Sequence, residues 1–325
     1  MRPSRSLDQT GLGLYNNAFI LYFEWKRLHK LVLDGIFVPN ITPFTREGGL
    51  DVKALRTCVR FWLESGVSGL VPCGSNGEAP YLSRQERSKV IEAVVDEVGG
   101  KVPVIAGTGT MSTKETIEFT NDARDLGVDA ALIVTPFYFK MTNREIYEHY
   151  RTVLEAVDIP IVVYNVPKFT GFSLDPTLIS QLASANERVV GVKDSSGSID
   201  TITEILGLVG GRISVMAGSA DVVLPTLSLG GRGAIVAVAN VFPSLCTRLY
   251  EAFRNGKFEE ANRLQECITM VNEVLVKKYN QLSAIKEALR LRGLPGGYPR
   301  MPALPLRGQE KIAVQSLLKA MDENP

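Results

Sequence analysis

The residues most able to do chemistry in this sequence lie between positions 189 and 196, a stretch that reads VVGVKDSS. It is a short β-branched run that ends in Lys193 and is followed by small polar residues. Runs of this kind, bounded by turn residues, are typical of buried parallel strands. A lysine at the carboxyl end of such a strand lies at the mouth of a sheet or barrel, where desolvation favours the neutral, nucleophilic amine. The alternative is a lysine that extends into solvent, as most strand-end lysines do.

The other reactive residue types limit which chemistry is open to the chain. Its only histidines are His29 and His149, which argues against a histidine-bound metal and against a Ser-His-Asp triad, so we expect no metal. The cysteines are far apart and contain no C-x-x-C pair, so we expect buried, reduced thiols of a cytoplasmic protein. They are Cys58, Cys73, Cys246 and Cys267.

Length and composition place the chain among ordinary globular proteins. Its 325 residues, 45% hydrophobic and 22% charged, suit one large α/β domain or two medium ones. Lys plus Arg (36) nearly cancel Asp plus Glu (35), so no nucleic-acid surface is indicated. Residues 18–23 are apolar but fall short of the ~20 residues that span a bilayer, so we expect no membrane partner. We expect residues 1–34 to form an amphipathic helix or a disordered leader, not a signal peptide, and assign them no chemistry.

Eight apolar runs, separated by segments of helical periodicity, predict the architecture. Glycines 66, 127 and 230 each precede a run and predict left-handed helix ends, and Ser83 with Glu86 predicts a capping box. The expected helices are 51–64, 83–98, 113–126 and 144–156. The expected strands are 36–39, 69–72, 102–106, 131–134, 160–164, 189–193, 213–217 and 234–238.

Eight successive βα units over about 210 residues have the size of a (β/α)8 TIM barrel. An open, doubly wound sheet is the main alternative, but neither G-x-G-x-x-G nor G-x-x-x-x-G-K-[ST] is present to mark its nucleotide site. We therefore predict an α/β barrel at residues 35–242. A C-terminal helical extension at 243–325 should pack on it, with helices near 243–255, 258–276, 282–292 and 309–321.

Functional residues of such barrels lie at the carboxyl ends of the strands. Together, the residues at these ends resemble the dihydrodipicolinate synthase / N-acetylneuraminate lyase family of pyruvate-dependent class I aldolases, over residues 35–305. The most specific motifs are GSNGE at 74–78, YNVP at 164–167 followed by Thr170-Gly171, and GVKDSSG at 191–197. The remaining strand ends are Thr42, TPFY at 135–138, Gly218 and Ala239.

The resemblance implies a catalytic set. The Lys193 amine would condense with the ketone of pyruvate, and the resulting imine would serve as the electron sink, so no metal or organic cofactor is required. Tyr164 would shuttle protons close to the imine. Ser75 would link Tyr164 to Tyr138, which would reach across from a neighbouring subunit. The protein would then be a homo-oligomer, a dimer of dimers.

The resemblance also implies a substrate-binding set. Ser75 and Asn76, with Gly74 allowing close approach, would present N–H donors to the pyruvate carboxylate. Thr42, Phe169, Gly218 and Ala239 complete the predicted set.

Each assignment has a structural alternative. Tyr164 could be a core aromatic, Tyr138 a packing residue of its loop, and Gly218 a turn former. We expect Glu78 to brace its loop, and the basic side chains of Lys140, Lys168 and Arg232 to be solvated, with contact to an anionic substrate as the lesser alternative.

Two departures from the family pattern bear on the substrate. Phe169 stands where the synthases carry an arginine that holds the carboxylate of aspartate semialdehyde, and an aromatic ring cannot make that bidentate contact. Gly-Ser-Asn replaces their Thr-Thr, and resembles relatives that cleave 4-hydroxy-2-oxoglutarate or 2-keto-3-deoxy sugar acids. We therefore favour a pyruvate aldolase or lyase acting on a small aldehyde or oxo acid, with 4-hydroxy-tetrahydrodipicolinate synthase as the alternative.

Two further classes stay open. A barrel that binds oxo acids without turnover would be expected to lose Lys193 or Tyr164, and both are present. A phosphosugar aldolase would be expected to show a phosphate loop, and none is evident in the sequence.

Overall fold

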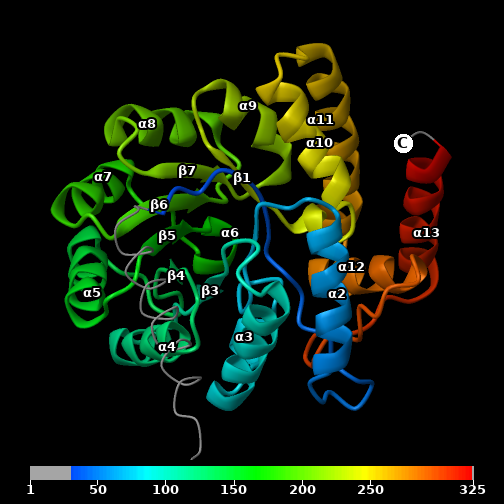
Figure 1. The fold of residues 1–325 in the computed structure, drawn as a ribbon, viewed down its shortest axis with the longest axis horizontal. Coiled ribbons are helices and arrows are strands. Elements are labelled where there is room, and N and C mark those ends of the chain that lie inside the picture. The colour runs from blue at the N-terminus through cyan, green and yellow to red at the C-terminus, as the bar shows by residue number, and fades with distance from the viewer. Residues whose placement is uncertain (1–30, 324–325) are drawn as a thin grey trace, which may run out of the picture. The chain divides into compact units, whose positions relative to one another are not determined.

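Eight parallel strands lie at the centre of the fold, in the order β2-β1-β8-β7-β6-β5-β4-β3 (Figure 1). The computed structural model describes residues 31–323, and the chain from Leu33 onward forms one compact unit. The sheet closes on itself because Leu70 of β2 forms a parallel bridge with Val104, just before β3. The strands are β1 (Gly35–Val38), β2 (Gly69–Leu70), β3 (Ile105–Gly107), β4 (Ala130–Val134), β5 (Ile161–Asn165), β6 (Val189–Asp194), β7 (Ser214–Ala217) and β8 (Gly233–Ile235).

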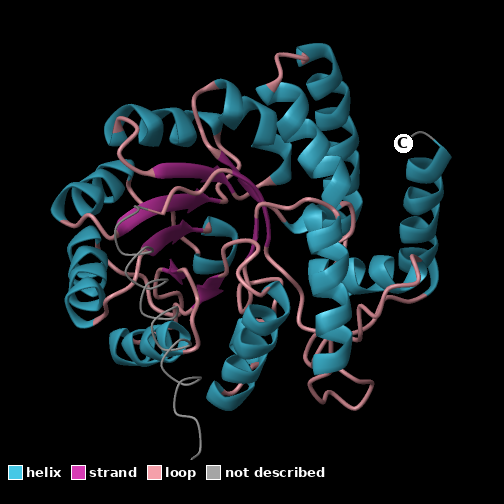
Figure 2. Ribbon diagram, viewed as in Figure 1, coloured by secondary structure: helices cyan, strands magenta, loops and turns pink. Residues whose placement is uncertain are grey.

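Helices alternate with the strands and surround the sheet, as Figure 2 shows. This alternation confirms the predicted (β/α)8 barrel. The helices that follow the strands are α2 (Val52–Glu64), α3 (Arg84–Val98), α4 (Thr113–Asp125), α5 (Asn143–Ala156), α6 (Pro167–Thr170), α7 (Pro176–Ala185), α8 (Ile199–Val209), α9 (Val223–Ser228) and α10 (Pro243–Arg254). Single turns of 3₁₀ helix are η1 (Ala79–Tyr81), η2 (Ala220–Val222) and η3 (Ala237–Asn240).

Local sequence signals explain where several helices begin and end. Ser83 and Glu86 form the predicted capping box of α3, in which each side chain accepts from the backbone N–H of the other. A second capping box opens α5. Gly66, Gly127 and Gly230 have φ values of 72°, 86° and 102°, a left-handed conformation that residues with a Cβ rarely adopt. These turns return the chain from a helix to the next strand.

The C-terminal region follows α10 and contacts the barrel. It consists of α11 (Phe258–Asn272), a π-helical segment η4 (Glu273–Lys278), α12 (Gln281–Leu291) and α13 (Gly308–Glu323). The Gln265 side chain of α11 accepts from the backbone N–H of Leu224 and donates to the carbonyl of Ala220. The N–H of Tyr298 donates to the carbonyl of Phe44, after β1. The predicted extension is therefore helical and hydrogen-bonded to the barrel.

Several element bounds differ from the expected ones, among them those of β2 and β3. Two further differences lie at the eighth strand and in the C-terminal region. The eighth strand ends at Ile235 because residues 237–240 turn into η3. There Asn240 accepts from the N–H of Ile41 and donates to the carbonyl of Pro39, which joins the first and last units of the barrel. The expected helix 258–276 leaves α-helical geometry after Asn272 and continues as η4.

The predicted division into residues 35–242 and 243–325 stays a prediction. Most of the predicted N-terminal extension, residues 1–34, lies outside the described residues. None of the helices in the described part of the chain is long and apolar enough to span a membrane.

Candidate active site

Lys193 and Tyr164 lie side by side on neighbouring strands. They are register partners in the pairing of β6 with β5, so both side chains point to the same face of the sheet. Their residues are 4% and 5% exposed, although lysine is rarely buried this deeply. The Lys193 Nζ lies 4.3 Å from the centroid of the Tyr164 ring. The structure therefore brings together the amine and the phenol that the sequence singled out.

The residues that follow this pair hold the two strand ends together. Asn165 Nδ2 donates to Asp194 Oδ2 at 2.6 Å, and Asn165 Oδ1 accepts from the N–H of Leu174. Asp194 Oδ1 accepts from the N–H of Ser196 at 3.0 Å. Asn165 and Asp194 are both fully buried. This pair fixes how Tyr164 and Lys193 face each other, a supporting role that the sequence did not indicate.

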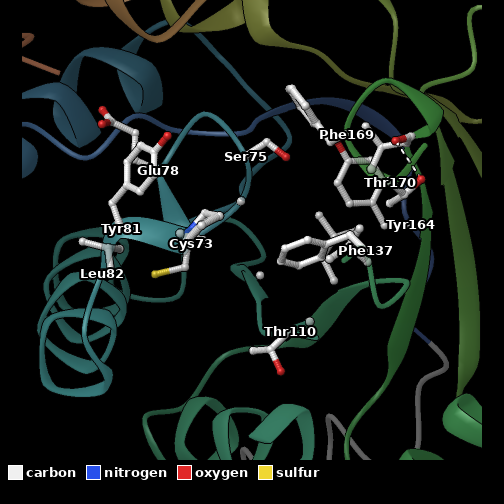
Figure 3. Close-up of a pocket in the computed structure, with 18 of the residues that line it drawn as sticks. Cys73, Ser75, Glu78, Tyr81, Leu82, Thr110, Phe137, Tyr164, Phe169 and Thr170 are labelled. Carbon is white, nitrogen blue, oxygen red and sulfur yellow. Dashed lines mark hydrogen bonds between the residues drawn. The ribbon is translucent and has the colours of Figure 1, made fainter. Parts of the chain in front are cut away.

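A cavity of about 890 Å³ opens beside Tyr164 (Figure 3). The buried Lys193 is not among the residues that line it. Gly74, Ser75, Tyr164 and Phe169 are among the residues that line it. In Figure 3, the Ser75 hydroxyl points toward the side of the cavity where Tyr164 and Phe169 lie. Cys73 also lines the cavity, but burial raises the pKa of its thiol to about 12, so it stays a protonated thiol near neutral pH.

Asn76 is buried and bound to the C-terminal region. Its Oδ1 accepts from Gln281 Nε2, at the start of α12, at 2.8 Å. Gln281 lines the cavity, and its Oε1 accepts from Lys168 Nζ at 3.0 Å. The loop that carries Ser75 and Asn76 is therefore tied to a residue 205 positions further along the chain.

Glu78 braces the same loop, as predicted. Its residue is 1% exposed, and its backbone is left-handed at φ 55°. Its Oε1 forms an ion pair with Lys286 Nζ at 2.5 Å, and its Oε2 accepts from the N–H of Arg300 at 2.9 Å. The Lys286 ammonium also donates to the carbonyls of Thr42 and Tyr298 and lies over the Phe44 ring. Burial lowers the pKa of Lys286 to about 8.

Four predicted substrate-binding residues, Asn76 among them, are not among the residues that line this cavity. Thr42 is buried, and its Oγ1 donates to the carbonyl of Gly77 at 2.8 Å, which braces the loop at 74–78. Ala239 is buried within η3. Gly218 packs against the end of β6, where its N–H donates to the carbonyl of Asp194 at 2.6 Å. A Cβ on Gly218 would lie 2.8 Å from that carbonyl oxygen.

Tyr138 lies on the loop after β4 and is 76% exposed. It packs edge to face on Phe139, with ring centroids 5.0 Å apart. The neighbouring Phe137 lines the cavity instead. Within one copy of the chain, Tyr138 is therefore not brought to Tyr164, and its predicted role needs a second copy.

A comparison with known proteins decides which family this barrel represents. The model of the dihydrodipicolinate synthetase family matches residues 32–321. The chain belongs to the dihydrodipicolinate synthetase family. It is therefore an enzyme of the class I aldolase type, which forms or breaks carbon–carbon bonds.

Similar proteins cover almost the whole barrel and C-terminal region. The 4-hydroxy-tetrahydrodipicolinate synthase of Citrifermentans bemidjiense is 37% identical over 288 residues, 89% of this chain and 98% of that protein. The synthase of Methanothrix thermoacetophila is 38% identical over 290 residues, 89% of this chain and 97% of that one. A prophage protein of the family from E. coli K12, solved with pyruvate, superposes with a TM-score of 0.87 at 30% identity, covering 90% of this chain and 99% of that one.

Proposed function

We propose that this protein joins pyruvate to an aldehyde, or reverses that reaction, through an imine on Lys193. The observation that carries the proposal is a buried lysine amine 4.3 Å from the ring of Tyr164, a residue that lines a cavity at the carboxyl ends of the barrel strands. Membership of the family supports the same chemistry.

The proposed chemistry needs no group beyond those of the chain and its substrates. The neutral Lys193 amine adds to the pyruvate ketone, and loss of water gives an iminium ion. The iminium makes the methyl group acidic, and removal of one proton gives an enamine. The enamine carbon attacks the aldehyde, whose oxygen takes up a proton. Water then hydrolyses the new iminium and frees Lys193, so the reaction is redox-neutral and the amine is regenerated.

Tyr164 is placed to move these protons. Its phenol ring faces the Lys193 amine, and it lines the cavity that would hold the substrates. A positioned acid–base group contributes about 10²- to 10⁴-fold to a rate. Changing Tyr164 to Phe should therefore lower kcat by at least ~100-fold while leaving Lys193 able to form the imine slowly.

The first acceptor that we propose is L-aspartate 4-semialdehyde. The curated relatives at 37% and 38% identity are 4-hydroxy-tetrahydrodipicolinate synthases, which supports the synthase over the cleavage reaction that the sequence alone favours. Cleavage of 4-hydroxy-2-oxoglutarate or 2-keto-3-deoxy sugar acids is the second candidate. It is favoured by Phe169, an aromatic side chain that lines the cavity where an arginine would bind a carboxylate.

Parallel assays of the purified protein test the two candidates. One follows the condensation of pyruvate with L-aspartate 4-semialdehyde, and the other follows release of pyruvate from each hydroxy-oxo acid. The proposal expects kcat/KM to be at least tenfold higher for the condensation. A higher value for cleavage would assign the enzyme to the second candidate, and no turnover with an intact pyruvate imine would exclude both.

We also propose that the enzyme works as a homo-oligomer. The exposed Tyr138 on the loop beside the cavity supports this, because its predicted role in the proton relay requires a neighbouring copy. Sedimentation velocity should show a dimer or tetramer. A stable monomer with full activity would exclude the relay through Tyr138. A cytoplasmic location stays a prediction.

A further inference from the structure

The basic side chains that line the cavity differ in how they are partnered. They are Arg84, Arg87, Lys168 and Lys277. Arg84 and Lys277 form ion pairs with carboxylates at 2.6 and 2.7 Å, and Arg87 donates to two backbone carbonyls. Lys168 makes hydrogen bonds to neutral oxygens, and within residues 31–323 no carboxylate forms an ion pair with it. Among the basic residues of the described lining, Lys168 is thus the one that is exposed and has no carboxylate partner, since Arg87 is buried.

Neutral acceptors fix the Lys168 ammonium in place. Its Nζ donates to Gln281 Oε1 at 3.0 Å and to the carbonyl of Val276 at 3.3 Å. Val276 lies near the end of η4, where backbone carbonyls have no partner within the helix. An ammonium has three N–H donors, so these two bonds hold the group and leave one donor for a ligand.

This ammonium is connected to both halves of the proposed site. Gln281, which accepts from Lys168, donates to Asn76 on the loop proposed to receive the pyruvate carboxylate. Lys168 also follows Tyr164 by four positions, in α6 directly after β5. Burial lowers the pKa of Lys168.

We propose that Lys168 selects acceptor aldehydes that carry a carboxylate, by donating a charge-assisted hydrogen bond to that carboxylate. The inference rests on the proposed aldolase function and deepens it by naming the anionic acceptor class. Phe169 supplies an apolar wall beside the ammonium, whose Nζ lies 5.4 Å from its ring centroid. The positive charge missing at position 169 is thereby provided from position 168, one residue earlier in the same short helix.

The test compares charged and uncharged acceptors in Lys168→Met and in the unchanged enzyme. With L-aspartate 4-semialdehyde or glyoxylate, kcat/KM should fall by about 10- to 100-fold, the loss of one hydrogen bond to a charged group. With glycolaldehyde or propanal it should not change. Lys277→Met is the matched control, because it removes a lysine that lines the same cavity but is paired with Asp221. This control should leave the ratio of the two acceptor classes unchanged.

Three results would overturn the inference. The first is an equal loss of kcat/KM for charged and uncharged acceptors, and the second is no loss of kcat/KM for either class. The third is a rise confined to the KM of pyruvate, which would mean that Lys168 only positions Asn76 through Gln281. If uncharged aldehydes react too slowly, the inhibition constant of succinate against the acceptor serves instead, and it should rise by the same factor in Lys168→Met. An unchanged constant would contradict the proposal.

Borohydride reduction with pyruvate separates this inference from the proposed function. Both the unchanged enzyme and Lys168→Met should retain the covalent pyruvate adduct. If both proteins form the adduct but Lys168→Met shows no change in the preference for charged acceptors, the role proposed for Lys168 is wrong and the aldolase proposal stands. If neither protein forms the adduct, the aldolase proposal itself is wrong.

Discussion

Replacing Lys286 with methionine should destabilise the protein more than any surface change, although Lys286 lies in a C-terminal helix. Its side chain is 1% exposed and pairs with Glu78, whose side chain is fully buried. Removing the ammonium leaves a buried carboxylate without its counter-charge and takes a donor from the carbonyls of Thr42 and Tyr298. Breaking one partner of a buried pair costs about 3–5 kcal/mol.

The same substitution should also disturb the loop at 74–78, which forms part of the proposed active site. Glu78 ends the GSNGE loop in a left-handed conformation, and Lys286 also binds the carbonyl of Thr42, whose hydroxyl braces Gly77. We therefore expect Lys286→Met to raise the KM of pyruvate as well. The methionine keeps most of the apolar stem, which limits the cavity left behind.

A double-mutant cycle measures this coupling. Urea denaturation at fixed protein concentration gives the free energy of unfolding for Lys286→Met, Glu78→Gln and the double variant. The free energy of unfolding of the double variant should fall by about 2 kcal/mol less than the sum of the losses in the two single variants, because neither charge is then left unpaired. Lys319→Met, whose side chain is 78% exposed, is the control and should stay within ~0.5 kcal/mol. A cost below ~1 kcal/mol for Lys286→Met, or strict additivity, would refute the reasoning.

Two further predictions concern buried groups. Burial lowers the pKa of His149 from 6.5 to about 4. As pH falls from 6.5 to 4, the unfolded chain therefore binds a proton that the folded chain does not. The stabilisation that is present above pH 6.5 is lost by pH 4. Between pH 7 and 4.5, the free energy of unfolding measured by urea denaturation should therefore fall by about 2 kcal/mol less in His149→Asn than in the unchanged protein. An equal fall in both proteins would contradict this. Gly218→Ala places a Cβ 2.8 Å from the carbonyl oxygen of Asp194, next to Lys193, so it should slow pyruvate trapping by borohydride more than Gly207→Ala, which meets no atom within 4 Å. Equal trapping rates in the two variants would argue against this placement.

The barrel and the central pair could be predicted because their signals are local. Eight apolar runs and their turn residues define the strands, and a strand-end lysine with a strand-end tyrosine one unit earlier must meet at the same edge of a parallel sheet. The structure places Lys193 and Tyr164 in register. The capping box at Ser83 and the glycine turns are likewise set by short stretches of sequence.

The supporting residues could not be predicted because their partners are distant in sequence. Lys286 contacts the carbonyl of Thr42 across 244 positions, and Gln281 contacts Asn76 across 205. A lysine in a helix of mixed composition resembles a solvent-exposed charge until the element packed against it is known. Lys168 is exposed, as predicted, but it also lines the cavity, which its sequence position alone did not indicate.

Borohydride reduction in the presence of pyruvate, followed by peptide mass spectrometry, shows whether Lys193 forms the proposed imine. We expect one stable adduct of reduced pyruvate on the peptide that contains Lys193, and none in a Lys193→Met variant that keeps the far-ultraviolet circular dichroism of the unchanged protein. An adduct on another lysine, or turnover of pyruvate without any adduct, would show that Lys193 is not the nucleophile.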